Sequence, residues 1–155
     1  MRDQVRAWQD QGDEVVFTNG CFDILHMGHI DYLEGARELG DHLVIGLNSD
    51  ASTRRLKGET RPINTEHSRA YLLASLGVVD LVTIFEEDTP ADLIKMVVPD
   101  ILVKGGDYSA DSVVGGDTVR EHGGKVVILP FKEGYSTTSI EEKILALGRA
   151  NNKNA

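Results

Sequence analysis

Residues 15–29 read VVFTNGCFDILHMGH, an apolar run followed by a loop and the predicted start of a helix. The run at 15–18 is rich in β-branched and aromatic residues, which is typical of a strand. In the loop, Gly28 stands between His26 and His29 and has no side chain to keep a ligand away from the backbone. The stretch therefore predicts the strand, loop and helix that make up one unit of a parallel α/β sheet.

The rest of the chain repeats this alternation of short apolar runs and longer amphipathic segments. The predicted strands, each buried on both faces, are 15–18, 43–48, 81–85, 101–104 and 126–129. The predicted helices are 5–9, 29–39, 65–76, 90–97, 117–122 and 139–148. We therefore expect a Rossmann-like, doubly wound α/β fold, in which a five-stranded parallel sheet carries helices on both faces. One domain should cover 1–155, with a helical extension at 1–12 and a frayed tail at 151–155.

Composition limits the class of protein. The 155 residues fit one domain, since domains average about 150 residues. The single cysteine, Cys21, cannot form an internal disulfide and fits a reducing compartment, so we expect a cytoplasmic location. The net charge of −9 argues against nucleic acid as a partner. No apolar run approaches the roughly 20 residues that cross a bilayer, and residues 1–13 lack a signal-peptide core, so no membrane partner is expected.

The predicted ligand site lies beyond the carboxyl ends of the strands, where the strand order of a doubly wound sheet reverses. His26 and His29 project from one side of a first helical turn, whose free N–H groups attract anions. Five basic residues also fall within sixteen positions of this acidic chain: Arg54, Arg55, Lys57, Arg61 and Arg69. Their spacing indicates a small anionic ligand or, equally well, a solvated surface.

Other interpretations of these residues stay open. The two histidines could be structural, Phe22 could serve packing alone, and Asp23 and residues 136–139 also fit ordinary helix caps. Cys21, Asp23 and the two histidines form a conceivable zinc ligand set, although no second cysteine exists to complete a usual structural site. Neither G-x-x-x-x-G-K-[ST] nor G-x-G-x-x-G follows the first strand, which argues against a P-loop enzyme and a dinucleotide dehydrogenase.

The run 19–29, which ends in H-M-G-H, resembles the signature of the cytidylyltransferase-like nucleotidyltransferase superfamily. Further segments narrow the resemblance to the adenylyltransferase domain of D-glycero-β-D-manno-heptose 1-phosphate enzymes, over 15–144. These segments are N-S-D at 48–50, R-L-K-G at 55–58, R-P at 61–62, F-E-E-D-T-P at 85–90, K-G-G-D-Y at 104–108 and S-T-T at 136–138. The resemblance implies that a sugar 1-phosphate attacks the α-phosphorus of ATP in line and gives ADP-heptose and pyrophosphate, for lipopolysaccharide core precursor synthesis.

The resemblance also implies roles for the matching residues. The catalytic set is His26, His29 and Lys57, with the histidines stabilising charge at the α-phosphorus. The implied nucleotide-binding residues are Thr18, Asn19, Gly20, Cys21, Phe22, Gly28, Lys104, Gly105, Asp107, Ser136, Thr137 and Thr138. The implied sugar-phosphate-binding residues are Asp23, Asn48, Asp50, Arg55, Arg61 and Arg69. Asp23 is also the candidate protein ligand for the Mg²⁺ that accompanies ATP.

The chain departs from the family pattern in two respects. Members commonly carry E-Q-R where this chain has His67, Ser68 and Arg69. Many also have an upstream sugar-kinase domain, for which 155 residues leave no room, so a separate kinase is expected to supply the sugar 1-phosphate. A glycerol-3-phosphate or related alcohol-phosphate cytidylyltransferase is the rival function, and a non-catalytic nucleotide-binding sensor is a rival of another class. The resemblance also allows a homodimer.

Overall fold

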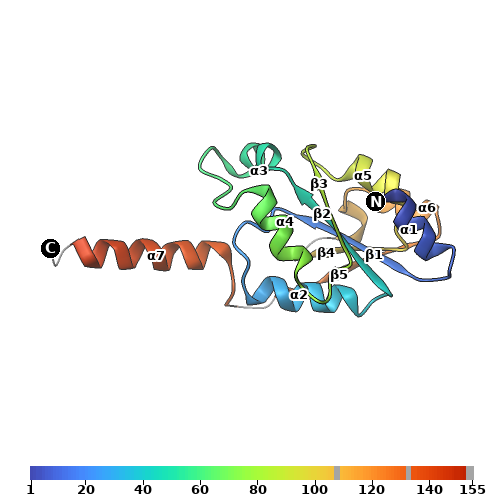
Figure 1. The fold of residues 1–155 in the computed structure, drawn as a ribbon, viewed down its shortest axis with the longest axis horizontal. Coiled ribbons are helices and arrows are strands. Elements are labelled where there is room, and N and C mark those ends of the chain that lie inside the picture. Colours follow the sequence, from blue (N-terminus) through green and yellow to red (C-terminus); the bar gives the residue numbers. More distant parts are fainter. Residues whose placement is uncertain (107–108, 132–133, 153–155) are drawn as a thin grey trace.

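A sheet of five parallel strands runs through the computed structural model, which describes residues 1–106, 109–131 and 134–152 (Figure 1). The strand order is β3-β2-β1-β4-β5, so the chain winds outward from β1 in one direction and then in the other. The strands are β1 Val15–Gly20, β2 His42–Asn48, β3 Leu81–Phe85, β4 Ile101–Gly105 and β5 Lys125–Leu129. This order confirms the predicted doubly wound sheet and puts its reversal between β1 and β4.

Helices cover both faces of the sheet, as predicted. They are α1 Arg2–Gln9, α2 Met27–Arg37, α3 Asp50–Lys57, α4 Glu66–Ala74, α5 Ala91–Val97, α6 Gly116–Glu121 and α7 Thr137–Asn152, with a 3-10 turn, η1, at Ala110–Ser112. Helices α1, α5 and α6 contribute buried side chains to one hydrophobic core, and α2 and α4 contribute to the other. In the described part of the chain, no helix is long and apolar enough to span a membrane.

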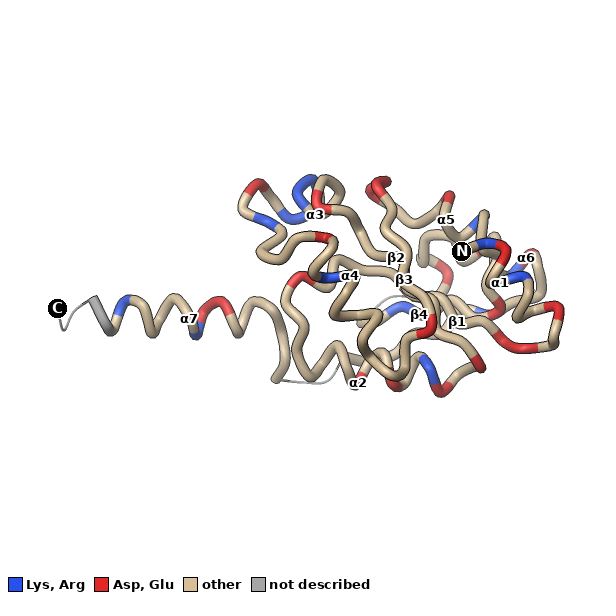
Figure 2. The backbone as a smooth tube through the Cα atoms, in the orientation of Figure 1, with Lys and Arg blue, Asp and Glu red and all other residues tan. Residues whose placement is uncertain are grey.

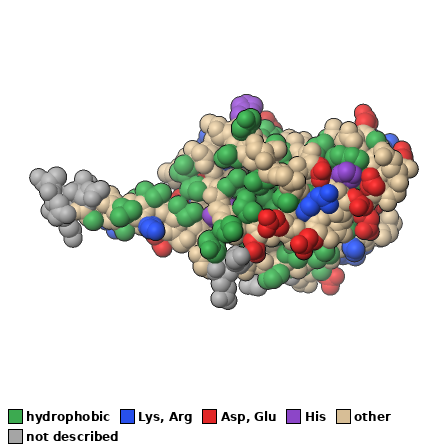
Figure 3. Space-filling view, turned by 60° about the horizontal axis from the view of Figure 1, so that its bottom comes forward, with side chains coloured by type: hydrophobic (Ala, Val, Ile, Leu, Met, Phe, Trp, Pro, Cys, Tyr) green, Lys and Arg blue, Asp and Glu red, His purple; other side chains and the backbone are tan. Residues whose placement is uncertain are grey.

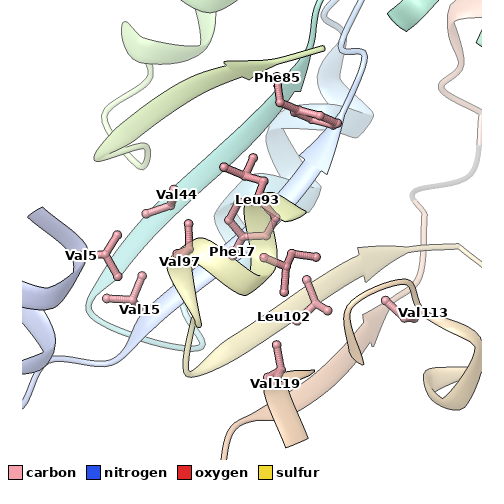
Figure 4. Packing of buried hydrophobic residues seen from close by; sticks show 11 residues of the cluster. Val5, Val15, Phe17, Val44, Phe85, Leu93, Val97, Leu102, Val113 and Val119 are labelled. Atoms are coloured by element: carbon pink, nitrogen blue, oxygen red, sulfur yellow. The ribbon is translucent and has the colours of Figure 1, made fainter. Parts of the chain in front are cut away.

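The alternation of side chains along β1 separates these two cores. Val15 and Phe17 pack with α1, α5 and α6 (Figure 4), whereas Val16, between them, packs on the opposite face with α2. Successive side chains of a strand point to opposite faces, so a strand inside the sheet needs apolar residues at every position. The prediction of strands buried on both faces is correct for β1, β2 and β4. It is wrong for β3 and β5, which are only half-buried because they form the edges.

The largest local difference from the prediction is helix α3, because the sequence predicts no element at 50–57. The Ser49 hydroxyl caps its start by accepting a hydrogen bond from the Ser52 N–H at 3.0 Å, and Gly58 ends it with φ of 103°. The helix is rich in charge and has few apolar residues, so periodicity did not reveal it. Helix α3 carries Lys57 at its carboxyl end, where a positive charge is favourable.

Helix α7 extends away from the sheet and the other helices (Figure 1). It begins before the predicted 139–148 segment and continues beyond it, to Asn152. Hydrophobic side chains are exposed along it (Figure 3), among them Ile144, Leu145 and Leu147. The tail predicted at 151–155 falls partly on 153–155, which lie outside the described residues.

Candidate active site

The two histidines of the loop after β1 stack on each other. His26 is the extended N-cap of α2, and His29 lies in the first turn of that helix. Their ring centroids are 3.9 Å apart with 23° between the planes, and Phe22 lies 5.3 Å from the His29 ring. The Nδ1 atoms of both rings are buried and find no hydrogen-bond partner in the described residues. Buried polar atoms are normally hydrogen-bonded, so two unpartnered nitrogens in one stacked pair are unusual and single the pair out as a candidate functional group.

Burial determines the protonation of the pair. Desolvation lowers the pKa of His26, and desolvation together with the nearby charges of His26 and Lys57 lowers the pKa of His29 to about 4. At pH 7 the imidazoles are therefore neutral, and each carries one N–H donor. Neutral donors suit oxygen atoms on which charge develops during a reaction.

The lowered pKa of His29 predicts a stability that depends on pH. Unfolded His29 takes up a proton near pH 6.5, whereas folded His29 resists until about pH 4, so protonation favours the unfolded state. Stability should fall as the pH drops from 6.5 towards 4. The urea midpoint of wild type should therefore decrease more between pH 7.5 and pH 5 than that of His29→Asn. A His67→Asn control removes an exposed histidine and should behave as wild type; equal decreases in all three proteins would contradict the prediction.

Three adjoining pockets lie at the carboxyl ends of the strands. The first, of about 410 Å³, and the second, of about 310 Å³, share Asn19, Lys57 and Lys104 in their linings. The third, of about 270 Å³, shares His29 and Lys57 with the second. Strand β1 pairs with β2 along its whole length but with β4 only through residues 16–17, so the pockets open where β1 and β4 part.

Lys104 on β4 and Asn19 on β1 connect the two strands at the point where they part. The Lys104 ammonium donates to the Asn19 Oδ1 atom at 2.9 Å, and burial lowers the pKa of Lys104. At the end of β4, Gly105 lies against the ring of Phe131, whose Cε1 atom would be within 3.0 Å of a Cβ added at 105. Asp107, the next predicted nucleotide contact, lies outside the described residues.

The amino end of α7 closes the third pocket. Ser136, Thr137 and Thr138 line it together with His26, His29 and Lys57. The Ser136 hydroxyl caps the helix by accepting a hydrogen bond from the Ser139 N–H at 3.0 Å. The third pocket therefore combines imidazoles, an ammonium group and the positive end of a helix, a combination that suits phosphate oxygens.

Carboxylates within the protein neutralise most of the basic cluster. Figure 2 shows basic and acidic positions close together on and beside helix α3. The pairs are Arg54–Glu59, Arg55–Asp88, Arg61 with both Asp23 and Glu141, and Arg69–Asp50. Lys57 is the member of the cluster that makes no ion pair among the described residues, and it lines all three pockets. Of the five cations from which an anion site was predicted, only Lys57 is thus without an ion pair among the residues that the structure describes.

The prediction that Arg69 binds the sugar phosphate is wrong. It is fully buried, and its guanidinium donates to the carbonyl oxygens of Cys21, Asn48 and Asn64 and to the Asp50 carboxylate. With its donors committed to protein acceptors, Arg69 cannot contact a substrate and instead joins the ends of β1 and β2. Asp50 is committed to the same network.

Asp23 also differs from its prediction. Its buried carboxylate accepts hydrogen bonds from Arg61 and from the backbone N–H groups of Ile63 at 2.8 Å and Asn64 at 3.0 Å. These donors occupy both oxygens, so Asp23 fits neither a metal ligand nor a sugar-phosphate contact, and organises the loop instead. No group of three or more His, Cys, Asp or Glu side chains able to hold a metal occurs in the residues that the structure describes, which leaves the zinc interpretation without a ligand set.

Most of the other predicted residues meet in the three pockets. Those that line them are Asn19, Gly20, Cys21, Phe22, His26, Gly28, His29, Asn48, Lys57, Lys104, Gly105, Ser136, Thr137 and Thr138. Thr18 does not, because it is buried beneath the site, where its hydroxyl and that of Tyr32 share a hydrogen bond of 2.6 Å. Arg55 and Arg61 also lie outside the linings and are held by carboxylates.

Sequence reasoning missed several residues of the linings. They are Leu56, Asp88, Thr89, Pro90, Ser112, Val113, Val114, Phe131 and Tyr135, together with Tyr32 beneath them. The F-E-E-D-T-P segment at 85–90 contains three of these residues, Asp88, Thr89 and Pro90. The sequence gives them no role, because only the fold brings the loop after β3 to the site.

Comparisons with known proteins agree with this geometry. The family described as cytidylyltransferase-like matches residues 17–143. The chain is 56% identical over 145 residues to the Bifunctional protein HldE of Magnetococcus marinus, covering 94% of this chain and 30% of that protein. It is 61% identical over 134 residues to the protein of the same name from Nitratiruptor sp., covering 86% and 28%. The chain thus spans about 30% of the length of the curated relatives it matches.

A solved structure supports the same relationship. The lipopolysaccharide core biosynthesis protein from Thermoplasma volcanium superposes with a TM-score of 0.64 at 33% sequence identity. The superposition covers 81% of this chain and all of that one.

Proposed function

The chain belongs to the cytidylyltransferase-like family, and from this we propose that it transfers an adenylyl group from ATP to D-glycero-β-D-manno-heptose 1-phosphate. The products are ADP-heptose and pyrophosphate. The observation that carries the proposal is the stacked pair of His26 and His29, with unpartnered Nδ1 atoms, beside Lys57 and the amino end of α7. The HldE relatives and the neighbour named for lipopolysaccharide core biosynthesis support the heptose substrate.

The proposed reaction needs donors rather than a base. The second pKa of a phosphate monoester is about 6, so the attacking oxygen is already largely ionised at pH 7. It attacks the α-phosphorus in line, the new P–O bond forms, and the bond to the pyrophosphate oxygen breaks. The neutral imidazole N–H groups donate to the oxygens of the α-phosphate, on which charge accumulates, while Lys57 and the α7 amino end hold the outgoing phosphates. Cys21 needs no role as a nucleophile.

Mg²⁺ is the proposed companion of ATP. Nucleotidyltransferases generally use a divalent metal with the nucleotide, and the metal neutralises charge on the phosphates. Because Asp23 is committed to Arg61 and two backbone N–H groups, the phosphate oxygens and water are the expected ligands. A kinase activity outside this domain would supply the sugar 1-phosphate. The cytoplasmic location, from the free thiol of Cys21, and the homodimer stay predictions.

The test is pyrophosphate release with ATP or CTP, each combined with heptose 1-phosphate or glycerol 3-phosphate. We expect release with ATP and heptose 1-phosphate at a rate far above the other three pairs. Release with CTP and glycerol 3-phosphate instead would assign the rival transferase activity. Tight ATP binding without release from any pair would favour a nucleotide sensor and overturn the proposal.

A further inference from the structure

Two contacts of described residues near the amino end of helix α7 hold it to the body of the protein. Tyr135, just before the helix, packs against Gly28, where an added Cβ would come within 3.0 Å of the Tyr135 Cβ. In the first turns of the helix, the Glu141 carboxylate pairs with the Arg61 guanidinium at 2.6 Å. Among the described residues this is the only ion pair between α7 and the rest of the chain. The remainder of α7 projects outward (Figure 1).

Arg61 is a firm anchor for this contact. Its side chain is only 14% exposed, and its other guanidinium nitrogen is bound to the buried carboxylate of Asp23. Asp23 in turn is held by the backbone of Ile63 and Asn64. Asp23 lies in the same loop as His26, so the contacts from Glu141 through Arg61 to Asp23 tie helix α7 to the loop that carries the paired imidazoles.

Glu141 lies one helical turn after Thr137 and Thr138, the residues that line the third pocket. Because a helix is rigid over one turn, fixing Glu141 also fixes the distance of these hydroxyl groups and of the helix end from His26 and His29. We propose that Glu141 is a positioning residue, which holds the amino end of α7 over the paired histidines. This inference rests on the proposed nucleotidyl transfer, and it adds a residue for which the sequence predicted no function.

The inference predicts an effect on binding rather than on the chemical step. If the nucleotide site is complete only while α7 is docked, the apparent affinity for ATP equals the intrinsic affinity multiplied by the docked fraction. Saturating ATP then restores the complete site. For a partly exposed ion pair, Glu141→Gln should raise the KM for ATP about three- to fivefold and leave kcat within about twofold of wild type. The matched control is Glu142→Gln, which removes the same charge from an exposed neighbour on the same helix.

Two measurements on the full chain test the proposal: steady-state pyrophosphate release, and amide hydrogen exchange of residues 134–145 without ligand. We expect Glu141→Gln to exchange faster than Glu142→Gln in this segment and to show the higher KM. Equal exchange in the two variants, or faster exchange with an unchanged KM for ATP, would overturn the positioning role. If wild type releases no pyrophosphate from any substrate pair, the proposed function fails, whereas equal exchange in an active enzyme rejects only the role of Glu141.

Discussion

Replacing His29 by alanine is expected to slow pyrophosphate release by a factor of about 10² to 10³, the usual effect of removing one donor to a transition-state oxyanion. His29 is the more buried of the stacked pair, and its lowered pKa keeps it a neutral donor at the working pH. His26→Ala should have a similar effect, since the two rings face the same pocket. The KM for ATP should change far less than kcat, because the lost interaction is strongest in the transition state.

The measurement is kcat under saturating ATP and sugar 1-phosphate, with circular dichroism to show that the variants fold. His67→Ala serves as the control, because His67 is exposed and lines none of the three pockets. It should retain the wild-type rate. Near-normal rates in both His29→Ala and His26→Ala would mean that the motif is structural only, and the mechanism proposed for this site would be rejected.

Replacing Arg69 by methionine is expected to lower the free energy of unfolding by about 3 to 5 kcal/mol, a size typical of removing one partner from a buried charged pair. Methionine fills most of the space but donates no hydrogen bond. The carbonyl oxygens of Cys21, Asn48 and Asn64 would lose a donor in the interior, and Asp50 would lose its ion pair. The damage should be greatest where the loop after β1 meets the end of β2.

Urea denaturation at pH 7.5 measures this loss. Arg54→Met is the matched control, since Arg54 lies half-exposed on α3 and reaches Glu59 only at 4.0 Å. Its unfolding free energy should stay within about 0.5 kcal/mol of wild type. An Arg69→Met protein of normal stability with a raised KM for the sugar phosphate would instead restore the ligand role that the sequence predicted for Arg69.

Local patterns were sufficient to predict the α/β class and the position of most elements. Strand β3 has the predicted bounds, and α2 begins within two residues of its prediction, because apolar runs and helix periodicity report on burial directly. Helix α3 shows the limit of this approach. Its start depends on a Ser49 cap and its end on Gly58, so capping signals would have found it where hydrophobic periodicity did not.

The charged residues near the site show a different limit. Arg55, Lys57, Arg61 and Arg69 look alike in the sequence, yet only Lys57 lacks an ion pair among the residues described. The carboxylates that neutralise the others lie far away in the chain, as Asp88 does from Arg55 and Glu141 from Arg61. Sequence spacing cannot tell a cation that awaits a ligand from one already paired across the fold.

The sequence by itself determined the parallel sheet, the loop with two histidines at the end of β1, and the family of the chain. These features depend on residues that are neighbours in the sequence. The tertiary structure alone decided which strands form the edges, that Arg69 and Asp23 support the loop from within, and that Glu141 of α7 pairs with Arg61. Those outcomes depend on which distant segments the strand order brings together, and on the need of every buried charge for a partner.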